Sequence, residues 1–438
     1  MLIRLILLFI GSCFLLTSPE AEAQIHDAPI ILKGFQIRRT TKYPIKSYAL
    51  FQTNSKGEAT PIPFQIDEVN RLGDYILDQG PQHNLKSSNG LFDTQDELVF
   101  MGNDVGPAIP PQKFPQKKPD DLFEIKFKNS HTKKEGAVYL GVFLKDPPPK
   151  SDRKYTIYSP PKATITTSRY KYFFDHQNYL VLTRVDSNPT SLLGKKPMTI
   201  LDSSTFFLKA DLKYFLTFEA NHRSVSSELE AFKAGPVRVI VRVNFYYTLL
   251  KLNFEAGMYT EVSFFSNSVI LPAILYSPID GTESLNEDSY FYYGFAFRHS
   301  PSQYELASNM NPWPHPMNHF SKQKNKLGRN YLYWGSLVHD QHMVYLEIKP
   351  SRKLHKMGAE PLLYVNKAPS GTLKADNDDI LDLDKAPVNL GVAFDLTKFP
   401  EGENVMSFKL FFENYSSPKQ LDSFKNLWQW YHRVKKLP

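Results

Sequence analysis

Hydrophobic and polar positions alternate along much of the chain with a period of two, the period of a strand with one buried face. Val237–Val243 shows this clearly, because apolar residues alternate there with Arg238 and Arg242. The pattern predicts one face in the core and the other against solvent or a ligand. Further segments that alternate or form β-branched or aromatic runs, and that turn-forming residues bound, are Ser47–Gln52, Leu122–Lys128, Ala137–Lys145, Tyr179–Val185, Tyr259–Phe265, Tyr290–Phe297, Met343–Ile348 and Met406–Glu413. Helical periodicity is scarce, so we expect a mostly β protein built as an antiparallel β-sandwich.

Two proline-rich segments in the first third of the chain predict a division into domains. Gly106–Pro119 is unsuited to an interior strand, because proline lacks the N–H that a sheet requires. Pro147–Pro149 and the polar residues after it are typical of a stiff linker. We therefore expect a small N-terminal β domain with acidic loops over 24–146 and a large β-sandwich domain over 147–416.

The last part of the chain, 417–438, has a different pattern. Apolar residues recur there at helical spacings, namely Leu421, Phe424, Leu427, Trp428 and Tyr431, with basic residues between them. The spacing predicts a C-terminal amphipathic helix that packs its aromatic stripe on a sheet. A helix that lies on a membrane surface or binds a partner is the alternative.

The N-terminus reads as a signal peptide over 1–23. Arg4 precedes the apolar run Leu5–Leu16, and Ala21–Ala23 has the small-x-small pattern of a cleavage site. The run is shorter than the roughly 20 apolar residues that span a bilayer, so no transmembrane span is expected in the mature chain. We therefore expect an exported bacterial protein. It would be located either in the periplasm or on the outer-membrane and extracellular side.

Cys13 is the only cysteine in the sequence. Ile10–Cys13 resembles a lipobox, so a lipoprotein anchored through Cys13 is the alternative to cleavage after Ala23. Cleavage after Ala23 leaves a mature chain without disulfides or thiolate metal sites.

Composition narrows the function classes further. A hydrophobic content of 42% excludes bulk disorder. The net charge of +7 is spread thinly, without the basic runs of nucleic-acid binding proteins, so no nucleic-acid partner is expected. The sequence also lacks a P-loop, a dinucleotide fingerprint and the common hydrolase motifs, which leaves open whether the protein is an enzyme.

Acidic residues of the N-terminal domain suggest a cation site. The segment before the expected strand Leu98–Met101 partly matches a calcium loop, although Leu85 stands at the first ligand position. Neighbouring loops would then supply the missing oxygens. The candidate calcium ligands are Asp67, Glu68, Asn89, Asp93, Asp96 and Asp104. An acidic turn ahead of a buried strand is the alternative interpretation.

Two further clusters carry weaker metal signals. Asp376–Asp384 contains five carboxylates, which suit either a solvated loop or a cation site. His315, His319, His339 and His342 have spacings that zinc sites use, but the prolines around His315 oppose a helix that would present two of them together. Loop histidines packed among aromatic residues are the favoured interpretation.

Aromatic residues gather between Tyr290 and Trp334 and suggest a carbohydrate platform. Flat rings with polar edges stack well on the apolar faces of sugars. The candidate ligand-binding residues are Tyr290, Tyr292, Arg298, Trp313, Tyr333 and Trp334. The alternative is that part of this set fills the core of the sandwich, because strand alternation directs only some of it outward.

Three short motifs carry a family resemblance. They are PIPFQIDE at Pro61–Glu68, FDTQDELVFM at Phe92–Met101 with the following Asp104 and Gly106, and AGPVRVI at Ala234–Ile240. Together they resemble uncharacterised exported β-rich bacterial proteins and are similar to the mutarotase-like supersandwich group, which includes domains of polysaccharide lyases and their companions. The resemblance implies a large antiparallel sandwich, as in a supersandwich, and a link to carbohydrate. No lyase base or neutralising residue carries over from it.

The sequence therefore supports three function hypotheses. The first is an exported carbohydrate-binding protein of the cell envelope, with calcium as a structural aid. The second is a polysaccharide-active enzyme of the lyase or hydrolase type. The third is a structural or interaction subunit of an envelope complex. The specific ligand and the oligomeric state stay open.

Overall fold

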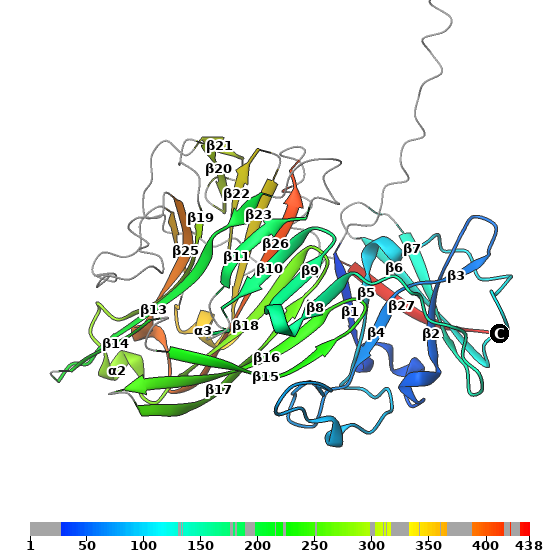
Figure 1. Ribbon diagram of the computed structural model, residues 1–438, viewed down its shortest axis with the longest axis horizontal. Helices are drawn as coiled ribbons and strands as arrows, with labels where there is room; N and C mark the ends of the chain where they lie inside the picture. The colour runs from blue at the N-terminus through cyan, green and yellow to red at the C-terminus, as the bar shows by residue number, and fades with distance from the viewer. Residues whose placement is uncertain are drawn as a thin grey trace, which may run out of the picture.

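We analysed a computed structural model of the chain (Figure 1). The structure describes residues 28–438 except 130–132, 134, 176–177, 180–181, 189–197, 215, 222–224, 250–251, 298–302, 310, 312, 317–332, 341, 360, 366–387, 416–420 and 422–429. The predicted signal peptide, Cys13 and the acidic segment Asp376–Asp384 therefore lie outside the described residues. In the described part of the chain, no helix combines the length and apolar character needed to cross a membrane.

The protein is mostly β, as predicted, and its N-terminal part forms a small two-sheet sandwich together with the last strand of the chain (Figure 1). One sheet has three strands in the order β1 (Pro29–Lys33), β5 (Glu97–Met101) and β4 (Phe64–Asp67). The other has five strands in the order β27 (Trp430–Leu437), β6 (Asp121–Asn129), β7 (Glu135–Val142), β2 (Tyr48–Thr53) and β3 (Ala59–Pro61). Apolar residues of both sheets form one core between them.

The larger part of the protein contains three more sheets, and their strands pair antiparallel. The largest has the order β15 (Val225–Ala234), β16 (Val239–Leu249), β17 (Leu252–Phe264), β18 (Ser268–Ser277), β26 (Gly402–Asn414), β23 (His342–Pro350), β22 (Tyr333–His339), β20 (Glu305–Ser308) and β21 (His315–Pro316). The second has the order β14 (Thr217–Asn221), β13 (Ser203–Asp211), β19 (Tyr290–Phe297), β25 (Val388–Asp395) and β24 (Leu362–Val365). The third has the order β12 (Thr199–Leu201), β11 (Leu182–Ser187), β10 (Tyr170–Phe174), β9 (Thr164–Thr167) and β8 (Thr156–Ser159).

One continuous apolar core joins these three sheets. Helices among the described residues are short. The α-helices are α2 (Gly281–Ser284) and α3 (Arg352–Lys356). The 3-10 turns are η1 (Gly34–Thr40), η2 (Ile45–Ser47), η3 (Leu85–Ser87), η4 (Gly102–Asp104), η5 (Pro160–Lys162) and η8 (Leu396–Lys398). A sandwich architecture with few helices is therefore confirmed.

The segments that the alternating pattern predicted as strands are strands. Tyr290–Phe297 matches β19 at both ends. Predicted segments also overlap β2, β6, β7, β11, β16, β17, β23 and β26, with ends that differ by a few residues. The alternation was therefore a sound guide to where strands occur.

The predicted C-terminal helix is wrong for its last turns, because Trp430–Leu437 is strand β27. This strand pairs antiparallel with β6 of the small sandwich along its whole length, from Trp430 opposite Asn129 to Leu437 opposite Leu122. Val434 packs against the small core, while Tyr431 is exposed on the other face. The segment thus follows a period of two here, and completing the sheet edge satisfies its backbone groups. Of the residues before it, the structure describes Leu421, which is buried.

The two sandwiches pack directly against each other through the three-stranded sheet. On β5, Leu98 and Phe100 face the small core, whereas Val99 and Met101 face the large sandwich. There they contact Val237 and other apolar side chains of the larger part. Since neighbouring strand residues point to opposite faces, this one buried strand serves both cores.

Candidate functional site

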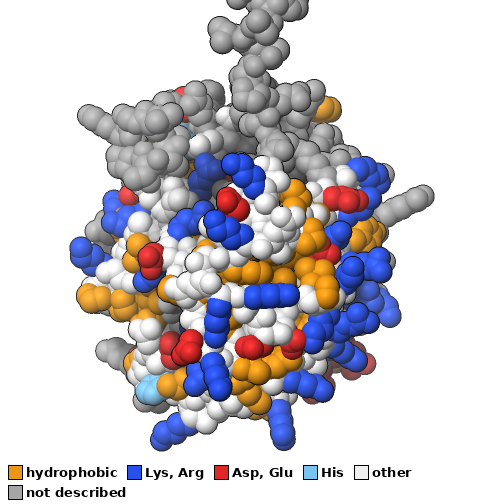
Figure 2. All heavy atoms as spheres, turned by 90° about the vertical axis from the view of Figure 1, so that its right-hand side faces the viewer, with side chains coloured by type: hydrophobic (Ala, Val, Ile, Leu, Met, Phe, Trp, Pro, Cys, Tyr) orange, Lys and Arg blue, Asp and Glu red, His pale blue; other side chains and the backbone are white. Residues whose placement is uncertain are grey.

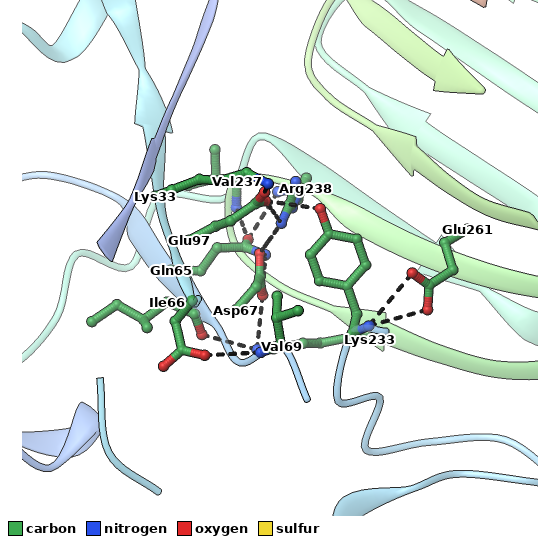
Figure 3. A network of polar contacts seen from close by, with 12 residues as sticks. Lys33, Gln65, Ile66, Asp67, Val69, Glu97, Lys233, Val237, Arg238 and Glu261 are labelled. Carbon is green, nitrogen blue, oxygen red and sulfur yellow. Dashed lines mark hydrogen bonds and ion pairs between the residues drawn. The ribbon is translucent and has the colours of Figure 1, made fainter. Parts of the chain in front are cut away.

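Residues from the three sequence motifs meet in one buried ion network between the two sandwiches (Figure 3). Asp67 ends β4, Glu97 begins β5, and Arg238 lies just before β16. The Nη2 atom of Arg238 is 2.7 Å from Oδ2 of Asp67 and 2.8 Å from Oε2 of Glu97. Arg238 is 1% exposed, so both contacts are shielded from water and count for more than surface pairs. The network joins the two sandwiches.

Two neighbours complete the charge balance around Asp67. Lys233 Nζ lies 2.8 Å from Oδ1 of Asp67, and Lys33 Nζ lies 4.0 Å from Oε1 of Glu97, so the two carboxylates face Arg238 and two lysines. Gln65 donates to Asp67 and accepts from the backbone N–H groups of Val237 and Arg238. Burial by itself would raise the pKa of Asp67, but Lys233 and Arg238 outweigh it and lower that pKa to about 2. Asp67 is therefore ionised at neutral pH and committed to protein partners.

A long loop from the small sandwich, Glu68–Asn84, lies on the outer face of the largest sheet. Its backbone pairs with β15 at Gln79 and Phe232, and Leu77 packs on Ile240 and Ala231. Gly80 has a positive φ of 105°, and a Cβ there would lie 2.7 Å from the Cα atom of Ala231. The β-bulge of β15 between Leu229 and Ala231 thus receives a loop residue that has no side chain.

Arg238 and Arg242 face this loop rather than solvent or a ligand. Arg242 donates to the carbonyl of Tyr75 at 2.8 Å and to Oε1 of Glu261 at 2.6 Å. Arg238 lies over the Tyr75 ring, whose hydroxyl donates to Glu97. The alternation of β16 was predicted correctly, but its polar face is covered by another part of the same chain.

Beside the docked loop, the structure has an open cleft of about 620 Å³. Leu72, Gly73 and Asp74 of the loop form one wall. The other walls come from β17, β18 and β26, with Tyr259, Thr260, Glu261, Pro272, Ile274, Tyr276 and Glu403. The volume lies within the range of small-ligand pockets, which commonly form between structural units.

The polar groups of the cleft are mainly acidic and are held in place. Tyr259 donates its hydroxyl to Asp74, and the Asn70 side-chain amide donates to the same carboxylate at 3.0 Å. Burial raises the pKa of Glu261, although the charge and hydrogen bonds of Arg242 oppose this. Glu403 is exposed at the rim, opposite Tyr276 on the neighbouring strand. The cleft therefore presents fixed acceptor oxygens beside an aromatic ring that is 53% exposed.

The candidate calcium ligands do not converge on one point. Asp67 has protein partners, and so does Asp104. The Asp104 carboxylate forms an ion pair with Arg153 and accepts a hydrogen bond from Tyr155. The backbone N–H groups of Val69 and Asp93 donate hydrogen bonds to the Asp96 carboxylate. Burial raises the pKa of Asp96 to about 6.

The other candidate ligands have protein donors as well. Glu68 accepts hydrogen bonds from Ser88, Asn89 and Gly90, and the Asn89 amide lies 3.3 Å from Asp93. Within the described residues, no group of three or more His, Cys, Asp or Glu side chains is arranged to hold a metal ion. Calcium binding therefore stays a prediction, which a change in melting temperature on chelation would test.

The predicted aromatic platform is not assembled on the surface. Tyr333 is buried in the large core, and Trp334 stacks on Tyr345 in a separate buried cluster. Tyr292 is buried outside the large core, against Gly294 and Gly391. Tyr290 is half-buried beside Phe207, and Trp313 is 58% exposed. Arg298 lies outside the described residues. For the β19 residues the reason is that both faces of this strand are covered, so every residue after Tyr290 is buried.

Of the four histidines considered as zinc ligands, the structure describes three. His315 lies in β21, while His339 and His342 form opposite positions of the β22–β23 pair. His339 packs against the ring of Tyr304, as expected of a histidine among aromatic residues. His319 is outside the described residues.

Sequence reasoning missed the residues that line the cleft. Asp74 stands far from Glu261 and Tyr276 in the chain, and no motif links the three residues. The one available signal was Glu261, a charged residue in a β-branched and aromatic strand segment, opposite Arg242 on β16. Cross-strand charge pairs of this kind show that a face is polar, but not that a cleft lies beside it.

Charge is distributed unevenly over the molecule. Figure 2 views the small sandwich side of the protein, where Lys and Arg side chains are widespread. The exposed residues of β6 and β27, such as Lys126, Lys128 and Arg433, contribute to this basic character. The acidic cleft therefore contrasts in charge with this side of the protein.

Comparisons with known proteins give distant structural likenesses only. No known family and no curated protein matches the sequence. An alpha-mannosidase from Enterococcus faecalis is similar with 10% identity and a TM-score of 0.45, over 94% of this chain and 44% of that chain. A protein in the glycosyl hydrolase family 38 from Enterococcus faecalis is similar with 9% identity and a TM-score of 0.44, over 94% and 46%. The Slr1438 protein from Synechocystis has 10% identity and a TM-score of 0.30, over 62% of this chain and 100% of that chain.

The chain thus spans less than half the length of the first two of these structures. Likeness at this level of identity and TM-score defines neither a shared fold nor a shared activity.

Proposed function

We propose that the protein is a carbohydrate-binding protein and that its binding site is the acidic cleft between the loop at Leu72–Asp74 and strands β17, β18 and β26. The observation that carries this proposal is a ligand-sized cleft in which carboxylates and an exposed tyrosine face the same space. Sugar hydroxyls donate hydrogen bonds to carboxylates, and sugar C–H faces stack on aromatic rings. With the leader predicted over 1–23, the ligand would be an envelope or environmental glycan.

The carboxylates of the cleft favour binding over cleavage. A general acid or a nucleophile has to reach the scissile bond, and glycosidases use a pair of such carboxyl groups. Asp74 and Glu261 are instead held by Tyr259, Asn70 and Arg242 of the protein itself. Polysaccharide cleavage therefore stays the alternative, and an assay for new reducing ends or unsaturated products tests it.

The test is calorimetric titration of the full chain with a panel of oligosaccharides from envelope and environmental polysaccharides. Calorimetry suits this cleft because its described lining contains tyrosines but no tryptophan. The variants are Glu403→Gln and Tyr276→Ala, which alter exposed rim residues and leave the buried contacts intact. The matched controls are Glu287→Gln and Tyr214→Ala, which change exposed residues that do not line the cleft.

At least one oligosaccharide should bind the wild type, and each rim variant should weaken that binding about tenfold, the effect of losing roughly 1.4 kcal/mol. The controls should bind like the wild type. Failure of every oligosaccharide to bind would overturn the proposal, as would binding that both rim variants leave unchanged.

A further inference from the structure

The largest sheet is split beside the cleft. Strands β17 and β18 pair at only two positions, Ser263 with Ile270 and Phe264 with Val269. Continuing this register would place Pro272 opposite Glu261. Proline has no N–H to donate to a neighbouring strand, and Pro272 keeps its place opposite Ser407 of β26 at the other edge of β18. Beyond Ile270 the backbone ladder between the two strands stops. The contact that continues past this point is the side-chain hydrogen bond from Thr260 to the carbonyl of Pro272.

Behind the split lies an apolar cavity of about 110 Å³ between the two facing sheets of the large sandwich. Phe206 and Phe291 line it from the sheet of β13 and β19. Ala273, Leu275, Met406 and Phe408 line it from β18 and β26. One water needs about 10–15 Å³ of such space and two to four polar partners. The walls are apolar except for the hydroxyl-bearing residues Thr260 and Tyr293. The cavity therefore suits hydrocarbon better than water.

The acidic cleft and the apolar cavity share part of their walls. Thr260, Pro272 and Ile274 line both spaces, so the cavity adjoins the cleft at the split between β17 and β18. Thr260 donates its hydroxyl to the carbonyl of Pro272, which satisfies polar groups at the edge of the opening. A smaller space of about 20 Å³ continues the cavity past Leu271 and Tyr293 toward β10.

We infer that the ligand is an amphiphile with a sugar headgroup and a single hydrocarbon chain. The sugar lies in the acidic cleft, and the chain passes the split at Thr260 and Pro272 into the apolar cavity. The modest volume of the cavity fits a short chain or the first part of a longer one. This inference rests on the proposed function, because the headgroup occupies the proposed sugar site.

The experiment titrates the full chain with alkyl maltosides of increasing chain length, each below its critical micelle concentration. Free maltose serves as the headgroup alone, and alkyl sulfates of matched length serve as the chain with a different headgroup. Ala273→Phe is the variant, because it places a ring in the cavity and leaves the cleft carboxylates untouched. Its melting temperature and its affinity for free maltose report whether the fold and the cleft are intact.

Affinity should rise by up to about fourfold for each methylene that enters the cavity, and level off when the cavity is full. Ala273→Phe should abolish this rise. The alkyl sulfates should bind more weakly than the maltosides, because the cleft is acidic. If Ala273→Phe fails to fold, the length series on the wild type decides alone.

Maltose binding without any gain from the chain would overturn the inference and leave the proposed function standing. Equal affinity for alkyl sulfates and alkyl maltosides would also overturn the inference, since the cleft would then not distinguish a sugar headgroup from a sulfate. Absence of binding by both maltose and its alkyl derivatives, together with a failed oligosaccharide panel, would overturn both proposals.

Discussion

The Nη2 atom of Arg238 and the Oδ2 atom of Asp67 lie 2.7 Å apart, with both side chains 1% exposed, and they belong to different sandwiches. Removing one member of a buried pair leaves an uncompensated charge, which typically costs 3–5 kcal/mol. Arg238→Met should therefore lower the free energy of unfolding by about 3–5 kcal/mol in urea titrations. Lys128→Met removes an exposed ion pair with Glu135 and should leave the free energy of unfolding nearly unchanged, because water screens such a pair. Equal losses in the two variants would contradict a structural role for Arg238.

Acid should unfold the protein partly through Asp67. The pKa of Asp67 in the folded protein is about 2, below its ordinary value of 3.8. A group with a lowered pKa stabilises the fold above its unfolded pKa, and this contribution disappears as the pH falls from about 4 to 2. It amounts to roughly 2 kcal/mol at neutral pH. Urea titrations at several pH values should show a shallower acid dependence for Asp67→Asn than for the wild type, whereas parallel curves would refute the assignment.

Gly80 should be essential for docking of the loop. Gly80→Ala combines a positive φ with a contact of 2.7 Å to the backbone of Ala231. Gly358→Ala provides the matched control, because Gly358 also has a positive φ but has nothing within 4 Å of its Cβ position. The control should lose about 1–2 kcal/mol of stability, as expected for a left-handed residue alone. Gly80→Ala should lose more and should expose the loop to protease; equal losses without cleavage would show that the close approach is unimportant.

Strand β27 should stabilise the small sandwich through its inward residues. Val434→Asp places a charge against the small core and should cost about 1–3 kcal/mol. Tyr431→Asp changes an exposed residue of the same strand and should stay within about 0.5 kcal/mol of the wild type. Thermal unfolding of both variants checks this. If 430–437 were a helix, Val434 and Tyr431 would not lie on opposite faces as they do in the strand. Similar losses of stability in the two variants would therefore contradict the strand.

The alternating pattern predicted the strands because burial of one face is encoded locally. Sheet order is not encoded in this way, which is why the aromatic residues of β19 were misjudged. Strand β19 is covered on both faces, so Tyr292 is buried beside Gly294 and Gly391, whose missing side chains make room for its ring. The local signal for this was the absence of any charged residue in Tyr290–Phe297, because a continuous apolar run is typical of a strand buried on both faces.

The sequence motifs identified the acidic residues, but they did not reveal which basic residues these contact. Asp67 and Arg238 both stood out in the sequence, one as a metal ligand and the other on a polar strand face. They are separated by 171 positions, and only the docking of two sandwiches shows that they neutralise each other. The C-terminal spacing was misleading for a similar reason, because the free edge of β6 decides the conformation of Trp430–Leu437.

Hydrogen–deuterium exchange, with and without the tightest-binding oligosaccharide, tests the central claim most directly. The account predicts slower exchange in the loop at Leu72–Ile76 and in β18 near Pro272–Tyr276, with no change around Trp313 and Trp334. Protection confined to the Trp313–Trp334 region, or no protection at a saturating oligosaccharide concentration, would contradict a sugar site in the cleft.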